Sequence, residues 1–453
     1  MRKNVSKYIS KIFPDKEFLR NFLTLFTGST LGQFIPFVAG PLLARLYVPA
    51  DFGLYALLSS TAGLASLVAT GSYEFAILTS DTDDEADSLS LLSSLLSFIF
   101  SCVATLILFL MVVFAKPWTN SAFGYTWFLV PLFVVFQGVL NATGYRLNRQ
   151  QKYGVMARGR LLRAAVMTSV QLLLGFLSLP WGLFPGMLTG HFSAAAYQLR
   201  SVRCYFHSAF RSFTIKNIKV LAAKYYRFPA FLMPAQLVNE LSIQTPVFLL
   251  KSFFSTSAVG FYALPQKFLN APVALIGNSI GQVFFQKAVE QKKHSESLAA
   301  TTLSLFRFLF RIGVVPFSIM LVFGDSVFVW LFGDQWVQSG LFAQMLSPWL
   351  LFVLSGSPIS KLFTVLDKQH QSLWLNLVLL TLRVAGLIAG ALFFSSQVMA
   401  VFLFSLLSFL YWVFLTFYIL RLAKVKVLPI IIETVVTWTI VVLPMVIVRY
   451  WLM

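Results

Sequence analysis

Residues 397–420 read QVMAVFLFSLLSFLYWVFLTFYIL, a run without a charged side chain. At about 1.5 Å per residue, a helix of about 20 residues crosses the ~30 Å hydrocarbon core of a bilayer. A membrane β-strand needs only about 9–11 residues, and its apolar and polar side chains alternate. The run is too long and too uniformly apolar for such a strand, so it predicts a membrane-spanning helix.

Apolar runs of this kind recur along the whole chain. With 58% hydrophobic and only 11% charged residues, the composition excludes a soluble enzyme, since soluble domains carry about 25% charged residues. The predicted fold class is therefore an all-α integral membrane protein. Thirteen segments are expected: 22–46, 52–78, 89–115, 125–145, 161–179, 181–199, 228–251, 257–285, 300–323, 340–364, 372–395, 397–420 and 428–449.

The formal charge of +19 would suggest nucleic-acid binding on a soluble chain. Most of the 35 Lys and Arg residues, however, fall on one predicted side of the membrane, as the positive-inside rule requires. The first apolar run has no cleavage site and is read as a retained helix with a cytoplasmic N-terminus. The chain is thus predicted to bind the lipid bilayer and no nucleic acid. The basic cytoplasmic ends are 1–21, 146–163, 200–227, 287–293, 361–368 and 421–426.

The sequence contains an internal repeat. Phe52–Leu57 reads FGLYAL and Val259–Leu264 reads VGFYAL; at the same spacing Gln33 matches Glu240. Two six-helix bundles with a parallel repeat and one extra C-terminal helix are therefore expected. A duplicated scaffold without transport is the alternative. The expected parts are a basic N-terminus (1–21), an N-terminal bundle (22–199), a basic linker (200–227), a C-terminal bundle (228–421) and an extra helix (422–453).

No predicted loop is long enough for a soluble catalytic domain. The sequence contains no P-loop, no HExxH and no Cys/His spacing typical of a metal site. We therefore expect a transporter that is not an enzyme and needs no cofactor or metal.

Four charged residues are expected near the middle of the bilayer: Glu240, Lys267, Arg311 and Arg383, at depths of about 15–18 Å along their helices. Intramembrane charges usually face a partner or an aqueous cavity. The three cations are candidate substrate-binding residues for an anion. Glu240 is either the ion-pair partner of Lys267 or a titrating site for a coupled H⁺ or Na⁺. Arg45, near the opposite membrane surface, is an anchor or a substrate gate.

The first repeat offers uncharged polar groups at similar depth. Gln33, Asn141 and His191 are candidate substrate-binding residues, because amides and imidazole both donate and accept hydrogen bonds from hydroxyl-rich ligands. The alternative is that they only hydrogen-bond between helices. A cationic wall facing an amide-lined wall would suit a sugar attached to a phosphate. Gln137 and Gln171 belong to the same group of polar residues.

At these residues the chain resembles the bacterial O-antigen and capsule oligosaccharide flippases, the Wzx-type polysaccharide transport family. That family belongs to the superfamily that also holds the lipid II flippase and multidrug exporters. The resemblance covers about residues 20–420. Four stretches carry it: LLARLYVPADFGLYAL at 42–57, YEFAILTSDTDDEADSL at 73–89, residues 225–286, which are the most specific, and WLFGDQWVQSGLFAQMLSP at 330–348.

The resemblance implies two six-helix bundles in a V, alternating access, and a bacterial inner (cytoplasmic) membrane location. The implied cargo is an undecaprenyl-pyrophosphate-linked oligosaccharide for lipopolysaccharide or capsule biosynthesis, with the polymerase and chain-length proteins of that pathway as candidate partners. Lys267 stands where the family commonly has a basic residue. The thirteenth segment departs from the family's twelve-helix pattern and leaves the side of the C-terminus open. A cation-coupled multidrug antiporter of the same fold and a membrane polymerase or glycosyltransferase remain as alternatives.

Overall fold

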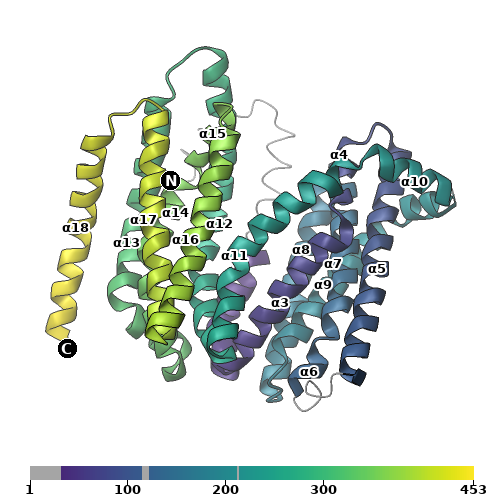
Figure 1. Cartoon of the computed structure of the whole chain (residues 1–453), viewed down its shortest axis with the longest axis horizontal. Coiled ribbons are helices and arrows are strands. Elements are labelled where there is room, and N and C mark those ends of the chain that lie inside the picture. The colour runs from purple at the N-terminus through teal and green to yellow at the C-terminus, as the bar shows by residue number, and fades with distance from the viewer. Residues whose placement is uncertain (1–31, 115–121, 212–213, 453) are drawn as a thin grey trace. The chain divides into compact units, whose positions relative to one another are not determined.

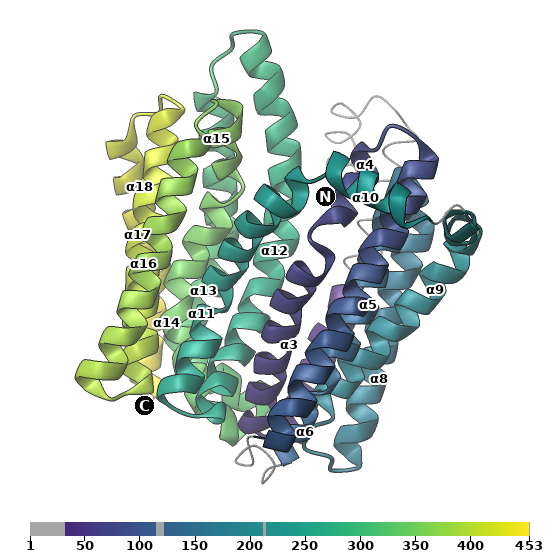
Figure 2. The same cartoon turned by 45° about the vertical axis from the view of Figure 1, so that its right-hand side comes forward.

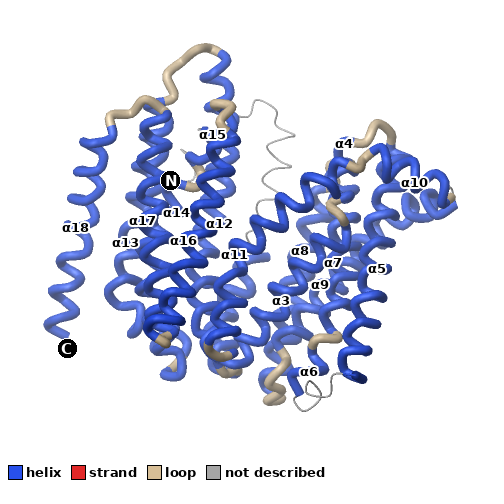
Figure 3. Tube along the Cα trace, viewed as in Figure 1, coloured by secondary structure: helices blue, strands red, loops and turns tan. Residues whose placement is uncertain are grey.

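The protein is helical throughout the part of the chain that the computed structural model describes, residues 32–114, 122–211 and 214–452 (Figures 1 and 3). Within these residues nine helices are long and apolar enough to cross a membrane, and no strand occurs. The predicted all-α membrane class is confirmed. Three further predicted segments are also helices but are more polar, and the first, 22–46, is described from residue 32 onward as a helix over 32–46. The predicted basic N-terminus, 1–21, lies outside the described residues.

The chain divides into two compact units. The first ends at Gln244 and the second begins at Thr245, except that the short segment Val48–Leu54 belongs to the second unit. The predicted six-helix bundles and the linker between them stay predictions, because this division does not test the repeat.

The first unit is a bundle of packed helices. Helix α5 packs against α7, and α9 packs against both α7 and α8. Its elements are the helix over 32–46, α3 (Pro49–Thr70), α4 (Tyr73–Thr79), α5 (Asp83–Phe114), α6 (Ala122–Thr126), α7 (Leu129–Arg149), α8 (Tyr153–Phe176), α9 (Leu183–Arg211), α10 (Ile215–Lys224), the π-helical turn η2 (Phe228–Leu232) and the first half of α11 (Met233–Phe253).

Small residues let these helices approach closely. On α5, Ser97 donates its hydroxyl to the Ser93 carbonyl four residues earlier (3.0 Å). A Cβ on Gly138 of α7 would lie 2.0 Å from the Ser97 Oγ. On α9, a Cβ on Gly190 would lie 2.8 Å from the Arg163 carbonyl of α8. Close packing through small residues is the usual way in which helices associate in lipid.

The second unit has longer helices and an aromatic core. Helix α14 packs on α12, α13 and α17, and α16 runs beside α17 in both views (Figures 1 and 2). Phe352 on α14 lies in its core with rings from α13 and α17 around it. The elements are α12 (Thr256–Lys293), α13 (Ala299–Phe332), η3 (Asp334–Trp336), α14 (Val337–Gly356), η4 (Ile359–Lys361), α15 (Leu362–Val365), α16 (Gln369–Phe394), α17 (Gln397–Leu422) and α18 (Val427–Leu452).

Two glycines form a close helix crossing inside the second unit. A Cβ on Gly53 would lie 1.8 Å from the Thr256 carbonyl oxygen, and a Cβ on Gly260 would lie 1.8 Å from the Pro49 carbonyl oxygen. These are the glycines of the two matching hexapeptides, so the repeated sequences pack on each other. Only residues without a side chain fit both positions.

Candidate functional site

A buried carboxylate lies among polar side chains in the first unit. Glu74 on α4 is 1% exposed, its Oε1 accepts a hydrogen bond from the Thr70 hydroxyl (3.1 Å), and it also interacts with the Asn141 side chain. Asn141 in turn accepts from the Gln137 amide (2.7 Å). The Glu74 Oε2 is buried without a hydrogen-bond partner among the described residues. Sequence analysis treated Glu74 only as part of a family motif. Its signal was an acidic residue at the end of an apolar run.

The predicted His191 is held by its own helix. Its Nδ1 lies 2.7 Å from the Met187 carbonyl oxygen, and its ring meets Phe133 edge-on at 4.6 Å between centroids. Gln171 is likewise occupied, since its amide donates to the Leu183 carbonyl (2.8 Å). The Gln171 bond joins two helices, as the alternative interpretation expects, whereas the His191 contact lies within its own helix. A substrate-binding role for His191 stays a prediction.

One cation of the first unit lies deeper than expected. Arg163 falls in the predicted cytoplasmic end 146–163, but α8 begins at Tyr153, which puts Arg163 about 15 Å along the helix. It interacts electrostatically with Tyr55 and lies near His191. The depth of Arg163 was not predicted because the predicted helix began at residue 161, eight residues after the start of α8.

Glu240 takes part in a short hydrogen-bond chain. The Gln244 amide donates to its carboxylate (2.7 Å), and Ser60 donates to the Gln244 carbonyl oxygen (2.7 Å). Of the predicted substrate residues, four are exposed: Gln33, Arg45, Lys267 and Arg311.

Arg311 has a carboxylate partner that sequence analysis did not assign. Glu433 on α18 binds Arg307 (Nη2–Oε2 2.6 Å) and Arg311 (Nη2–Oε1 3.3 Å). The sequence pattern named only Glu240 as a partner acid and did not consider Glu433. A substrate-binding role for Arg311 stays a prediction.

Arg383 lies inside the second unit and is 8% exposed. Its guanidinium carbon stands 5.0 Å from the Trp349 ring centroid and 5.6 Å from that of Phe404. Its Nε donates to the Ser408 hydroxyl at 3.4 Å. In this position it is surrounded by aromatic rings from α14 and α17.

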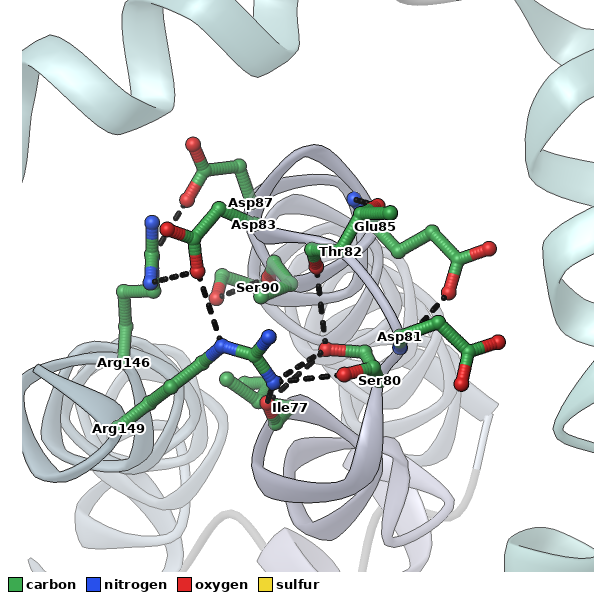
Figure 4. Close-up of polar contacts among 11 residues, drawn as sticks. Ile77, Ser80, Asp81, Thr82, Asp83, Glu85, Asp87, Ser90, Arg146 and Arg149 are labelled. Carbon is green, nitrogen blue, oxygen red and sulfur yellow. Dashed lines mark hydrogen bonds and ion pairs between the residues drawn. The ribbon is translucent and has the colours of Figure 1, made fainter.

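A network of ion pairs joins the ends of α5 and α7 in the first unit (Figure 4). Arg146, itself buried, binds Asp87 (Nε–Oδ1 2.5 Å) and Asp83 (3.2 Å). Arg149 binds Asp83 (2.9 Å) and also donates to the backbone carbonyls of Ser80 and Ile77. The acidic start of α5 is thereby fixed to the end of α7.

The same acidic cluster also binds the C-terminal end of α10. Lys224 binds Asp81 (2.7 Å) and Glu85 (2.6 Å), and the Tyr225 hydroxyl donates to Glu85 (2.9 Å). Lys224 lowers the pKa of the Asp81 carboxyl, while the two acids raise the pKa of Lys224. The described residues contain no group of His, Cys, Asp and Glu suited to a metal ion.

Comparison with known protein sequences identifies one family. A model of the family described as polysaccharide biosynthesis protein matches residues 42–340. Among curated protein sequences none matches this chain.

Several solved structures share the fold. The lipid II flippase MurJ in an inward closed conformation aligns over 96% of this chain and 97% of its own, with a TM-score of 0.67 and 12% identity. An inward-facing multidrug resistance MATE transporter of the MOP superfamily aligns over 88% and 95%, with a TM-score of 0.64 and 13% identity. A MOP superfamily transporter from Pyrococcus furiosus, described as having a binding pocket of reversed polarity, aligns over 89% and 95%, with a TM-score of 0.56 and 13% identity.

Proposed function

The chain belongs to the polysaccharide biosynthesis protein family, and from this premise we propose that it is a flippase for lipid-linked oligosaccharides. Its cargo is an undecaprenyl-pyrophosphate-linked repeat unit, which it moves from the cytoplasmic to the periplasmic leaflet by alternating access. The observation that carries the proposal is the family match over 42–340 in a multi-pass membrane protein. The similarity of its fold to a flippase whose cargo, lipid II, is also a lipid-linked saccharide supports it.

Moving a lipid-linked saccharide across the bilayer requires a protein that lowers the energy barrier for its head group. The lipid tail stays in the bilayer while the hydrated, anionic head group crosses hydrocarbon, where a charge is unfavourable by several kcal/mol. Fixed cations and hydroxyl-binding groups replace water around the head group. The membrane potential favours outward movement of an anion by about 2.3 kcal/mol per charge per 100 mV, or roughly 5 kcal/mol for two charges.

The residues proposed to contact the head group are exposed in the described part of the chain. Lys267 on α12 is proposed to bind the pyrophosphate, with Arg45 at the exit side and Gln33 toward the sugars. Asn141 and His191 are already bonded within the first unit, so we assign them to the support of that unit.

The proposed ion-coupling site is a carboxylate. Glu240 remains a candidate, and the buried Glu74 joins it, because an orphaned carboxylate oxygen in a low-dielectric interior is suited to bind a proton or a small cation. A cation-coupled multidrug antiporter is the second candidate function, favoured by these two acids and by the shared fold. Neutralising either acid in a flippase would change the dependence of export on the proton or sodium gradient.

The function can be tested in the native host after deletion of the oligosaccharide polymerase. Removing this gene is expected to abolish single repeat units at the cell surface and to leave the lipid-linked precursor inside. Surface repeats that persist in the deletion strain, together with lost resistance to cationic drugs, would refute the flippase and support the antiporter.

A further inference from the structure

The core of the second unit encloses a positive charge for which it supplies no carboxylate. Arg383 is 8% exposed, and among the described residues no ion pair includes it. A guanidinium remains protonated under all physiological conditions, and a lone charge in a low-dielectric interior requires a counter-charge. The ion-paired acids of this unit already bind other cations: Asp367 binds Lys292, Asp325 binds Arg449, and Glu433 binds Arg307 and Arg311.

The neighbours of Arg383 leave most of its donors unused. The hydrogen bond to Ser408 is long, at 3.4 Å, and most N–H···O bonds lie between about 2.7 and 3.2 Å. The Trp349 and Phe404 rings provide cation–π attraction, but they carry no net charge. Both rings are buried in the core.

Other donors around Arg383 also lack an acceptor. The Tyr262 and Tyr411 hydroxyls and the Trp349 indole nitrogen are all buried without a hydrogen-bond partner in the described part of the chain. Both tyrosines interact electrostatically with Arg383, which shows that they stand close to it. The indole N–H and the guanidinium can only donate, whereas the hydroxyls can also accept, so donor hydrogens outnumber acceptor oxygens in this cluster.

We propose that the second unit binds one monovalent inorganic anion of the halide class, such as chloride, at Arg383. The anion neutralises the guanidinium and accepts hydrogen bonds from Trp349, Tyr262 and Tyr411. One negative charge balances one cation, and a spherical ion accepts from donors in any direction. Four helices, α12, α14, α16 and α17, contribute to the site.

A small ion fits this location better than the proposed cargo does. Tyr262 is fully buried, and the other members of the cluster are at most 8% exposed, so a sugar diphosphate would have to separate packed helices to reach them. The site therefore goes beyond the proposed function: the anion is a structural counter-ion of the second unit, whichever cargo the protein carries.

The test is equilibrium binding of radioactive chloride to the purified full chain in lipid nanodiscs. The wild type is expected to bind one chloride saturably, bromide to displace it, and thermal stability to be higher in chloride than in gluconate. Trp349→Phe, which keeps the ring and removes only the N–H donor, should weaken binding by about tenfold, because hydrogen bonds to charged groups are the stronger ones. Arg383→Met should abolish binding.

Arg307→Met is the matched control, since it removes an arginine of the same unit that has a carboxylate partner, and its chloride affinity should equal that of the wild type. If Arg383→Met does not fold, the chloride affinity of Trp349→Phe tests the inference. Absence of saturable binding, or unchanged affinity in Trp349→Phe, would overturn the inference. Competitive displacement by millimolar pyrophosphate would also overturn it and would assign Arg383 to the cargo.

Discussion

The cationic side chains of this protein differ in the groups that they contact, and these contacts indicate their roles. Arg146 is buried and forms ion pairs with two aspartates, and Arg307 and Arg311 both bind Glu433. Arg383 instead contacts the rings of Trp349 and Phe404. Lys267 is exposed, as is Arg311. An exposed cation can exchange water for the head group of a substrate more readily than a buried one.

Neutralising Lys267 is expected to reduce export. Lys267→Gln removes the proposed charge for pyrophosphate, and the surface repeat signal in the polymerase-deleted host should fall at least tenfold, the effect of about 1.4 kcal/mol. Lys267→Arg should retain most of it. Lys293→Gln, on the exposed end of the same helix, is the control. Wild-type export by well-expressed Lys267→Gln would remove this residue from the site.

The contact between Lys224 and the acidic cluster should depend on pH in a defined way. The pKa of Asp81 lies below its ordinary 3.8, so its contribution to stability is present above that value and is lost as the pH falls through the lowered pKa. The pKa of Lys224 lies above its ordinary 10.5, so its contribution is present below that value and is lost as the pH rises through the raised pKa. Between these limits the contact should not change.

Hydrogen exchange of residues 215–225 measures this contact. Lys224→Met should speed exchange there at pH 7, and high salt should speed exchange in the wild type, because exposed ion pairs are screened. Lys219→Met changes a lysine of the same helix that makes no ion pair among the described residues, and it should leave exchange unaltered. Equal exchange in wild type and Lys224→Met would show that the pair does not hold the segment.

At the scale of elements, α18 is docked by charges as well as by apolar packing. It contacts α13, with Glu433 on Arg307 and Arg311 toward its start and Arg449 on Asp325 (2.6 Å) toward its end. Much of its remaining surface is exposed and apolar, from Leu428 to Trp451. A helix with that surface is suited to face lipid.

Removing the Glu433 charge should loosen α18. Glu433→Gln leaves two arginines without a carboxylate, and we expect a loss of about 1 kcal/mol, since these side chains are partly exposed. The readout is the thermal unfolding midpoint in nanodiscs, together with protease cleavage in the turn at 423–426. Glu290→Gln, an acid outside the ion pairs of the described residues, is the control. Identical midpoints for the wild type and Glu433→Gln would contradict docking by charge.

The glycine crossing makes a second prediction about elements. Gly53→Ala and Gly260→Ala each place a methyl group against a backbone carbonyl oxygen, and overpacking of this kind costs about 1–3 kcal/mol. Gly63→Ala, in the same helix α3 with no atom within 4 Å of the new Cβ, should instead stabilise the helix by up to about 1 kcal/mol. Thermal unfolding of the three variants tests this. Equal midpoints would show that the crossing is not close in the membrane.

The elements were largely predictable because membrane spans follow from local composition. Residues 397–420 predicted α17 almost to its ends, Gln397 and Leu422. The start of α8 was misplaced because Arg158, Arg160 and Arg163 were read as a cytoplasmic loop, although long basic side chains can extend from a helix toward polar surroundings.

The site was less predictable, because pairing depends on contacts between distant segments. Glu433 and Arg307 lie far apart in the sequence, and only the packing of α18 on α13 brings them together. Arg383 and Lys267 have similar predicted depths, yet one is buried among rings and the other is exposed. Depth along a helix follows from residue counting, whereas the direction in which a side chain points requires the neighbouring helices.

At the scale of the whole molecule, the chain is a multi-pass membrane protein of the polysaccharide biosynthesis family with the fold of MOP superfamily transporters. The proposed alternating access requires that this fold present its accessible cations first to one side and then to the other. The proposed cargo must then change leaflet without leaving the membrane.

The most direct test of the flippase proposal uses the purified protein in vesicles that contain lipid-linked oligosaccharide from the host. A sugar-oxidising enzyme too large to cross the membrane is added outside. Empty vesicles should protect about half of the oligosaccharide, the share in the inner leaflet. Vesicles with the protein should protect almost none, whereas protection of the same half in both would contradict the account.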